Sequence, residues 1–399
     1  MTVTTDRYPI RTAFRRFLPG YEASHMLSPQ QVKTANCISR CKTGELGYNV
    51  SICTNPDCRH AEIHAVSCNN RHCPCCQAPS EQKWIHARNS ELVEGIAYYH
   101  AVFTVPHALN DLIYQNQKLL YGLMFRCAAD TLLTLCKDPK HLGATPGIVA
   151  VLHTHGQKMN FHPHIHTILS GGGLNRAGKF IEAPHRGYFL PKEAMSRLFR
   201  GKFLDALRKL HDDGKLVFVG GCEKLRNSYE WKDFVNTLYE TSWIPEIKET
   251  FNGNGNAVRY LARYVFRSAI SNSRIESVDE SGVSFRFKDY ADGSAWKTMH
   301  MSGEDFIGAF LKHVLPAGFH RVRFYGFLAN GIRYKRLLLI HKIRNTVYAG
   351  NPVKDLSVPM LMKLLYNVDI DICPCCRSPA NHYRVQADYL NRAIRTLTT

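Results

Sequence analysis

The sequence is poor in acidic residues. Its 399 residues include 51 lysines and arginines but only 33 aspartates and glutamates, so the formal net charge is +18. Between residues 306 and 354 there is no aspartate or glutamate, while nine positions are lysine or arginine. This imbalance favours a polyanionic partner, most simply a nucleic acid.

The sequence also lacks a long apolar run and an N-terminal signal pattern. No apolar run approaches the roughly 20 residues that cross a bilayer, and residues 1–6 have no signal-peptide character. We therefore expect a cytoplasmic protein of two or three domains that makes no membrane contact. In a reducing compartment its 14 cysteines are expected to be metal ligands or buried thiols and not disulfides.

Eight of the cysteines are concentrated between residues 37 and 76, a segment with few large apolar residues. A segment of this composition needs a metal ion to fold. Two cysteine pairs within it are separated by 14 residues, which is typical of a zinc ribbon. The sequence therefore predicts one structural zinc ion held by Cys53, Cys58, Cys73 and Cys76.

The remaining ligand-type residues of this segment indicate a second, interleaved zinc site. Its predicted ligands are Cys37, Cys41, Cys68 and His72. His60 and His64 compete for the same site, and Cys75 is left as a spare thiol. Near the C-terminus, Cys373 and Cys376 repeat the Cys-x2-Cys spacing with only His382 nearby. That pair is either half of a zinc site or two exposed thiols.

Histidines cluster at residues 153–166. His164 and His166 are two residues apart at the start of an apolar, β-branched run, so on a strand both imidazoles project from one face. If the preceding apolar run forms a hairpin with it around residues 158–160, His153 falls nearly opposite Thr167 and beside His166. Two or three neutral imidazoles form an incomplete metal site. His155 and Gln157 are rival third ligands, and a histidine-rich turn without metal is the alternative.

Two tyrosines lie one helical turn apart in the segment 257–267. Tyr260 and Tyr264 are expected on one helix face, with Arg259, Arg263 and Arg267 around them. A phenol can attack phosphorus when it is ionised or positioned by a metal, and arginines can hold phosphates. The spacing alone is equally compatible with two half-buried tyrosines on an amphipathic helix.

The acid-free stretch interleaves cations with aromatic side chains, which is the pattern that single-stranded nucleic acid binding needs. Its predicted DNA-binding cations are Arg321, Arg323, Arg333, Lys335 and Arg336. A solvated basic helix over residues 331–345 is the alternative.

Taken together, these motifs resemble the two-tyrosine rolling-circle transposases of the insertion sequence 91 family, within the HUH (His-hydrophobic-His) endonucleases. The matching segments occur in the family's order at 68–77 (CNNRHCPCCQ), 100–106 (HAVFTVP), 152–157 (LHTHGQ), 162–166 (HPHIH), 171–174 (GGGL), 259–264 (RYLARY), 288–290 (KDY), 313–316 (HVLP) and 321–326 (RVRFYG). The chain departs from the pattern at Val265 and Phe266, where the family has a threonine and a histidine.

The resemblance implies an α+β fold, in which a central antiparallel sheet flanked by helices carries the histidines beside a tyrosine helix. It implies cleavage and joining of single-stranded DNA, at the ends of a mobile element and in target DNA, through 5′-phosphotyrosine intermediates. Tyr260 and Tyr264 are the implied nucleophiles, and we expect Tyr260 to attack first, although the sequence sets no order. His153, His164 and His166 are the implied ligands of magnesium or manganese, whereas imidazoles by themselves favour zinc or manganese.

The expected division is a basic lead-in (1–23), a zinc-binding domain with a linking helix (24–95), a nuclease domain (96–345) and a helical tail (346–399). The resemblance places the protein in bacterial cytoplasm at the nucleoid. Two other functions stay open. One is a replication initiator or conjugative relaxase with the same chemistry, and the other is a non-catalytic, zinc-containing DNA-binding regulator.

Overall fold

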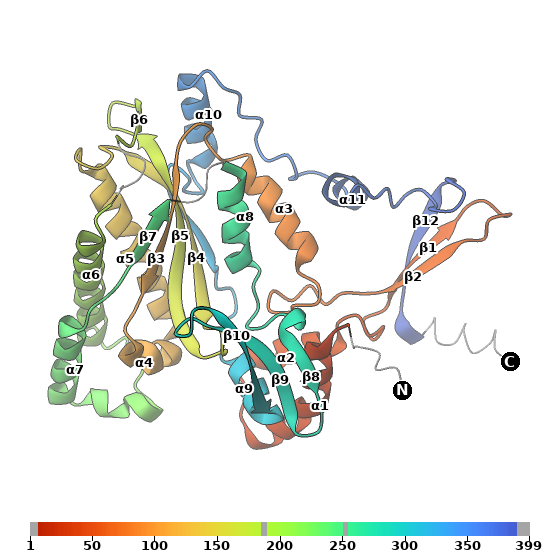
Figure 1. Cartoon of the computed structure of the whole chain (residues 1–399), viewed down its shortest axis with the longest axis horizontal. Helices are drawn as coiled ribbons and strands as arrows, with labels where there is room; N and C mark the ends of the chain where they lie inside the picture. The colour runs from red at the N-terminus through yellow and green to blue at the C-terminus, as the bar shows by residue number, and fades with distance from the viewer. Residues whose placement is uncertain (1–6, 185–189, 250–253, 389–399) are drawn as a thin grey trace.

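The computed structural model describes residues 7–184, 190–249 and 254–388, which contain three antiparallel sheets (Figure 1). In the central sheet the strand order is β11-β4-β5-β3-β7, and β6 pairs with β5. Its strands are β3 (Tyr98–Thr104), β4 (Thr145–His155), β5 (Phe161–Leu174), β6 (Phe180–Glu182), β7 (Glu246–Glu249) and β11 (Val322–Gly326). Helices cover both faces of this sheet (Figure 1). The predicted α+β fold with a helix-flanked antiparallel sheet is therefore confirmed.

The largest hydrophobic core fills one face of the central sheet. Alternate strand residues such as Ile148, Ala150 and Leu152 point into it. The helices that contribute to it are η1 (His107–Leu109), α4 (Asn110–Gln115), α5 (Gln117–Lys137), α6 (Lys192–Asp212), η2 (Gly220–Arg226) and α7 (Ser228–Glu240). Because side chains alternate along a strand, the residues between Ile148, Ala150 and Leu152 face the other side of the sheet.

By length and composition alone, α5 is the one helix of the described residues that could cross a membrane. The sequence has no unbroken apolar run of that length, but few charged residues interrupt this helix. Leu120, Met124 and Leu132 of α5 are completely buried in the core of the central sheet. Burial of this kind is typical of a core helix.

The other face of the central sheet carries α3 (Ala78–Asn89), α8 (Asn254–Val265) and α10 (Arg333–Ile343). Val149, Val151 and Ile168 pack here against Leu261 and Val265 of α8. Because side chains alternate along a strand, the histidines at positions 153, 164 and 166 share this face. The strand period thus places the histidine cluster against the tyrosine helix.

Helix α1 (Pro9–Ser24) occupies most of the segment that was expected to be a loose basic lead-in. Ile10, Phe14 and Leu18 recur every fourth residue and form a buried stripe, a helical period that the basic residues around it obscured. The Phe14 ring packs edge-on against Phe310 at 5.1 Å between centroids. The same core includes residues of α2 (Pro29–Arg40), β8 (Ile275–Val278), β9 (Gly282–Asp289), β10 (Ala295–Ser302) and α9 (Gly303–Leu311), and η3 (Asn272–Arg274) leads into β8.

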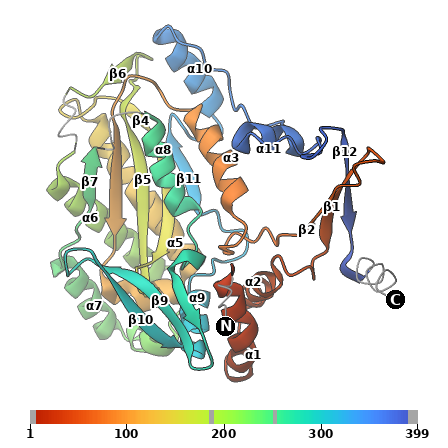
Figure 2. The same cartoon turned by 45° about the vertical axis from the view of Figure 1, so that its right-hand side comes forward.

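A third, small sheet joins the two ends of the described chain. β1 (Tyr48–Cys53) forms a hairpin with β2 (Ala61–Ala65), and β12 (Ala380–Val385) pairs with the other edge of β1. Helix α11 (Val358–Tyr366) leads to β12 and contacts α3 (Figure 2). The C-terminal tail therefore contains a strand as well as the predicted helix.

Candidate active site

Three histidines from β4 and β5 come together on the α8 face of the central sheet. One ring nitrogen from each of His153, His164 and His166 lies within 4.8 Å of the other two. The sequence predicts His153 nearly opposite Thr167, but in the structure His153 pairs with His164 across the hairpin. The loop consists of residues 156–160, closed by Gly156 N–H donating to the Asn160 carbonyl at 3.1 Å, and a bulge between His153 and His155 shifts the register.

Hydrogen bonds orient these three imidazoles. The Nδ1–H of His164 donates to the His162 carbonyl at 2.6 Å, so its Nε2 accepts from His153 Nδ1–H at 3.2 Å. His166 Nδ1 contacts His100 Nε2 at 2.9 Å. Nε2 of His153 and Nε2 of His166 are buried and have no hydrogen-bond partner. Orphaned buried nitrogens are costly unless something binds them, so this set fits a divalent cation.

The surroundings keep the three imidazoles uncharged. Burial lowers the pKa of His164 to about 4, and burial lowers the pKa of His153 and His166 well below the usual value for histidine. Burial also lowers the pKa of His100 to about 4. Neutral imidazole is the form that binds metals.

The two tyrosines of α8 lie directly over this cluster. The Tyr264 ring stacks on His166 with centroids 3.7 Å apart, and its hydroxyl donates to the Tyr260 oxygen at 2.8 Å. The Tyr260 ring packs edge-on against His100 at 4.9 Å. Burial is the main cause that raises the pKa of Tyr264, followed by the hydrogen bond to Tyr260. The two phenol hydroxyls are therefore hydrogen-bonded to each other, and they lie beside the three imidazoles.

An open cleft of about 420 Å³ gives access to the cluster. Tyr264 and all three clustered histidines line it, and so do the cations Lys158, Arg267 and Lys288. Tyr290, on the turn between β9 and β10, also lines the cleft and is 69% exposed. Lys158, Lys288 and Tyr290 were not among the predicted site residues. Lys158 lies in the hairpin loop next to the histidines, whereas only the fold brings Lys288 and Tyr290 of the β9–β10 hairpin to them.

Two residues were assigned no role from the sequence but contact the predicted site. His100 of β3 hydrogen-bonds His166 and touches both tyrosine rings. His313 donates from Nε2 to the Met159 carbonyl at 2.9 Å and accepts from Thr154 at Nδ1. Single histidines on a strand and at a helix end carry no spacing signal, so sequence could not assign them.

The rival third ligands lie outside the clustered set. His155 packs against the His153 ring at 4.0 Å between centroids but is not grouped with the three ligands. Gln157 instead donates to the Tyr290 hydroxyl at 3.1 Å. Phe266, the departure from the family pattern, packs edge-on against Trp84 at 6.2 Å.

The predicted DNA-binding cations lie in different places. Arg267 and Arg321 both line a small cavity beside His153. Four of the predicted cations are exposed on α8 and α10, namely Arg259, Arg263, Lys335 and Arg336. The last residues of α10 approach β6, because the adjacent Arg344 pairs with Glu182. β6 lies at the opposite end of β5 from His164, so α10 is remote from the cleft (Figure 1).

Two of the predicted cations are used inside the protein. Arg323 stacks over the rings of Phe125 and Phe319, at 4.5 and 5.2 Å from their centroids. Arg333 stacks over Phe324 at 4.8 Å and forms an ion pair with Glu91 at 3.3 Å. These contacts hold the arginines against the fold.

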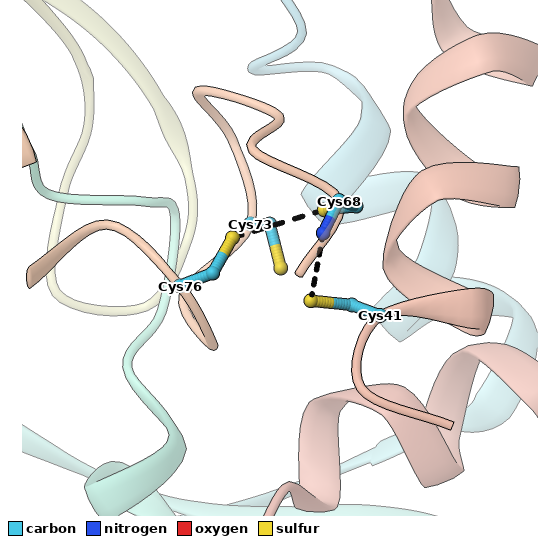
Figure 3. A group of neighbouring side chains, drawn as sticks. All are labelled: Cys41, Cys68, Cys73 and Cys76. Atoms are coloured by element: carbon cyan, nitrogen blue, oxygen red, sulfur yellow. Dashed lines mark hydrogen bonds between the residues drawn. The ribbon is translucent and has the colours of Figure 1, made fainter. Parts of the chain in front are cut away.

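The predicted pairs Cys53/Cys58 and Cys73/Cys76 each stay together, but they belong to two different four-cysteine groups and not to one site. Cys41, Cys68, Cys73 and Cys76 converge, with ligand atoms within 4.8 Å of one another (Figure 3). Cys53 and Cys58 lie in a separate group with Cys373 and Cys376. The physical reason is the β1–β2 hairpin, whose far end carries Cys53 and Cys58 away from the loop of Cys73 (Figure 2).

The other two predicted ligands of the second site stay apart from the thiols. His72 is buried, and its Nε2 accepts a hydrogen bond from the backbone N–H of Leu315 at 3.3 Å. Cys37 lies on α2 and belongs to neither cysteine group. The four-cysteine sets satisfy tetrahedral zinc without either residue.

Family models match most of the chain. A model described as "Putative transposase" matches residues 147–336, and one described as "Transposase zinc-binding domain" matches residues 13–105. The second match covers the Cys41 group, so the N-terminal part is a zinc-binding domain of this type, and its cysteines form a structural zinc site.

Two transposases of similar length are related to the chain over most of its residues. "Putative transposase y4qJ" of Sinorhizobium fredii is 42% identical over 81% of this chain and 81% of its own length. The transposase for insertion sequence element IS801 of Pseudomonas savastanoi is 30% identical over 87% of this chain and 82% of its own.

Two solved structures of the conjugative relaxase TrwC in complex with oriT DNA are far more distant. They are 14% and 12% identical, with TM-scores of 0.22 and 0.25. The first alignment covers 41% of this chain and 68% of the relaxase, and the second covers 60% and 96%. At these scores the alignments place no residue of this chain. The two family models and the transposase relatives show that the chain belongs to the insertion sequence 91 family of transposases, with an N-terminal zinc-binding domain.

Proposed function

We propose that this transposase cleaves and rejoins single-stranded DNA through a tyrosine linked to a 5′-phosphate. The observation that carries the proposal is the juxtaposition of two hydrogen-bonded phenols with three metal-ligand imidazoles at one basic cleft. DNA cleavage needs a nucleophile, a means of stabilising charge on the phosphate and a site for the strand. The cleft offers residues for all three.

In the proposed step a phenol oxygen bonds to phosphorus and the bond from phosphorus to the 3′-oxygen breaks. The phenol loses its proton, and the departing 3′-oxygen gains one and becomes a hydroxyl. Rejoining is the reverse, in which a 3′-hydroxyl attacks the phosphotyrosine and restores the phenol. Bond energy is conserved in the protein–DNA link, so no external energy source is needed.

His153, His164 and His166 would hold the divalent ion, which we propose is magnesium or manganese. When bound, the ion would polarise the scissile phosphate and withdraw charge from it. Hydrogen bonds to His162 and His100 fix the ring orientations of His164 and His166. His100 is therefore a positioning residue in this scheme.

We assign the first attack to Tyr264. This reverses the order expected from the sequence, in which Tyr260 attacks first. Tyr264 lines the cleft and stacks on His166, whereas Tyr260 is not among the cleft-lining residues. The hydrogen bond from Tyr264 to Tyr260 points the two oxygens at each other, so a phosphate that reaches one lies near the other. A second nucleophile allows a second strand to be cut while the first is still linked.

The cations of the cleft would hold the strand in place. Arg267, which also lines the small cavity beside His153, can neutralise the scissile phosphate, and Lys158 and Lys288 line the same cleft. The exposed Tyr290 ring offers a stacking surface for an unpaired base. The substrates are single-stranded ends of the mobile element and target DNA, in bacterial cytoplasm at the nucleoid.

A replication initiator or relaxase would share this chemistry but act at an origin, and a non-catalytic regulator would lack it. The discriminating experiment incubates the protein with divalent metal and a labelled single-stranded oligonucleotide, and detects a denaturant-resistant adduct. Tyr260→Phe combined with Tyr264→Phe should fold, bind DNA and form no adduct. Tyr290→Phe is the matched control, because Tyr290 is a cleft tyrosine outside α8. This variant should still form the adduct.

An adduct that persists in the double variant would show that the nucleophile lies elsewhere. A wild-type protein that binds DNA but forms no adduct with any metal would favour the regulator. Joining of two element ends, tested with both ends present, separates a transposase from an initiator or relaxase.

A further inference from the structure

Four cysteines from opposite ends of the chain meet beside the small β1-β2-β12 sheet. Cys53 is the last residue of β1 and Cys58 follows it, whereas Cys373 and Cys376 precede β12. The sulfur of Cys53 lies 3.4 Å from that of Cys376, and the sulfur of Cys58 lies 3.8 Å from that of Cys373. All four sulfurs are within 4.8 Å of one another. The family model for the zinc-binding domain ends at residue 105 and includes only the first pair.

Backbone pairing holds the two halves of this group in place. Cys53 is in register with Ala380 across the antiparallel strands, and Thr54 N–H donates to the Pro379 carbonyl at 3.0 Å. Thr54 also donates its hydroxyl to the same carbonyl at 2.9 Å. The thiols therefore meet because of the strand register, and their grouping follows from the fold of the whole chain.

The two cysteine loops have the same local shape. Arg59, directly after Cys58, has φ of 51°, and Arg377, directly after Cys376, has φ of 65°. The left-handed region is uncommon for an arginine, and it gives both loops the same turn directly after the second cysteine of the pair. Backbone N–H groups also point at the sulfurs, as in the 3.4 Å contact from Asn55 to Cys53. Donors aimed at sulfur stabilise a thiolate, which is the form that binds metal.

The small sheet has no hydrophobic core that could replace a metal. Among the described residues, none of the hydrophobic clusters includes a residue of β1, β2 or β12. Ile52, Ile63 and Tyr383 are 43–51% exposed on these strands. Sheets this small need a cross-link to be stable. Contacts of 3.4 and 3.8 Å are far longer than a disulfide bond, so four thiols around one ion remain as the cross-link.

We propose that Cys53, Cys58, Cys373 and Cys376 hold a second zinc ion, which fastens the C-terminal tail to the N-terminal hairpin. Four thiolates complete a tetrahedral, closed site of the structural kind. The ion joins segments more than 300 residues apart, so it ties together the two ends of the described chain. It also fixes the end of the segment that runs through α11, which contacts α3.

The test is the number of zinc ions per full-length chain, measured by native mass spectrometry and by elemental analysis. We expect two ions in the wild type. Cys373→Ser with Cys376→Ser, and separately Cys53→Ser with Cys58→Ser, should each leave one ion. Cys375→Ser is the matched control, because Cys375 lies between two of the ligands yet is exposed and outside the group. It should retain two ions.

One zinc in the wild type, or two in the Cys373→Ser, Cys376→Ser variant, would overturn the proposal. A second measurement needs no variant. Alkylation of the native protein should spare all four proposed ligands and label Cys375, and a chelator should expose the four. Labelling of Cys373 and Cys376 that a chelator does not change would contradict the site.

Mixing the two double variants separates a site within one chain from one shared between chains. The structure predicts that each stays at one zinc after mixing, since both halves must come from the same chain. Recovery of a second zinc in the mixture would contradict a site within one chain. None of these measurements depends on DNA cleavage, so failure of the zinc proposal and failure of the proposed nuclease activity are distinguishable.

Discussion

The histidine cluster and the Cys41 group are both metal-ligand sets, but they differ in ligand number and in surroundings. The histidines offer three ligands at the wall of an open cleft, next to two phenols and several cations. The Cys41 group offers four ligands, Cys41, Cys68, Cys73 and Cys76. These cysteines pack in the hydrophobic core that also contains residues of α1 and α9. Three ligands leave room for a substrate, whereas four close the coordination shell. The comparison separates a site arranged for chemistry from one arranged for folding.

The largest expected effect comes from opening the closed set. Cys73→Ser should release the zinc ion of the Cys41 group, because it removes one of the four ligands. The effect should be large, since structural zinc supplies on the order of 10 kcal/mol to the folding of small domains. We expect loss of one zinc per chain together with lower solubility or weaker DNA binding, measured by elemental analysis and DNA titration. Cys37→Ser is the control, since Cys37 lies outside both groups. A metal-free protein that is fully folded and binds DNA normally would break the comparison.

Removing a ligand from the open set should affect chemistry and leave the fold in place. His164→Ala and His166→Ala should each reduce cleavage by roughly a thousandfold or more, since a catalytic metal supplies several kcal/mol. DNA binding should persist and fall steeply with salt, because it depends mainly on phosphate contacts.

His162→Ala is the matched control for the histidine variants. The change keeps the His162 carbonyl that accepts from His164 Nδ1–H and removes a ring that contacts His164 at 5.1 Å between centroids but is not in the ligand group, so cleavage should fall far less than in the ligand variants. Normal nicking by either ligand variant would show that the metal assignment is wrong.

The buried histidines around the open set should also make stability depend on pH. Burial lowers the pKa of His313 to about 4, whereas an unfolded histidine titrates near 6.5. The unfolded state therefore takes up the proton first, so the stabilising effect is complete above about pH 6.5 and is lost as the pH falls toward 4. The loss from this residue is on the order of 3 kcal/mol.

Denaturant titrations across this pH range would measure the effect. His313→Gln should flatten the acid limb relative to the wild type, because it removes one group whose proton uptake favours unfolding. A profile that is equally steep in the variant would contradict the role of His313.

A smaller effect is expected at the rim of the cleft. Tyr290→Ala should weaken single-stranded DNA binding by about 1–3 kcal/mol, the range for one base stacked on an aromatic ring. Tyr290→Phe should bind almost as tightly as the wild type, because the ring is kept. Equal weakening by both changes, measured by fluorescence anisotropy, would show that the hydroxyl and not the ring matters.

Local patterns predicted the parts of the site that depend on one element. The strand period placed His164 and His166 on one face, and the helical turn placed Tyr260 beside Tyr264. The start of α2 is equally local, because Ser28 and Gln31 form a capping box in which each side chain bonds the other residue's backbone.

Features that depend on distant pairing could not be read from spacing. The grouping of Cys53 with Cys376 requires β12 to pair with β1 across more than 300 residues. Likewise His100 meets His166 only because β3 lies next to β5. The intramolecular stacking of Arg323 depends on rings from two other segments, Phe125 and Phe319. In each case the sequence shows the residue types and the fold selects their partners.

The most direct test of the account is to find which residue becomes linked to DNA. The wild-type protein would be trapped with a single-stranded substrate, digested with protease and nuclease, and the modified peptide sequenced by mass spectrometry. The account predicts a 5′-phosphate on Tyr264 after the first cleavage, and on Tyr260 when a second strand is supplied. A phosphate on Tyr290, which also lines the cleft, or on any residue outside α8 would contradict it.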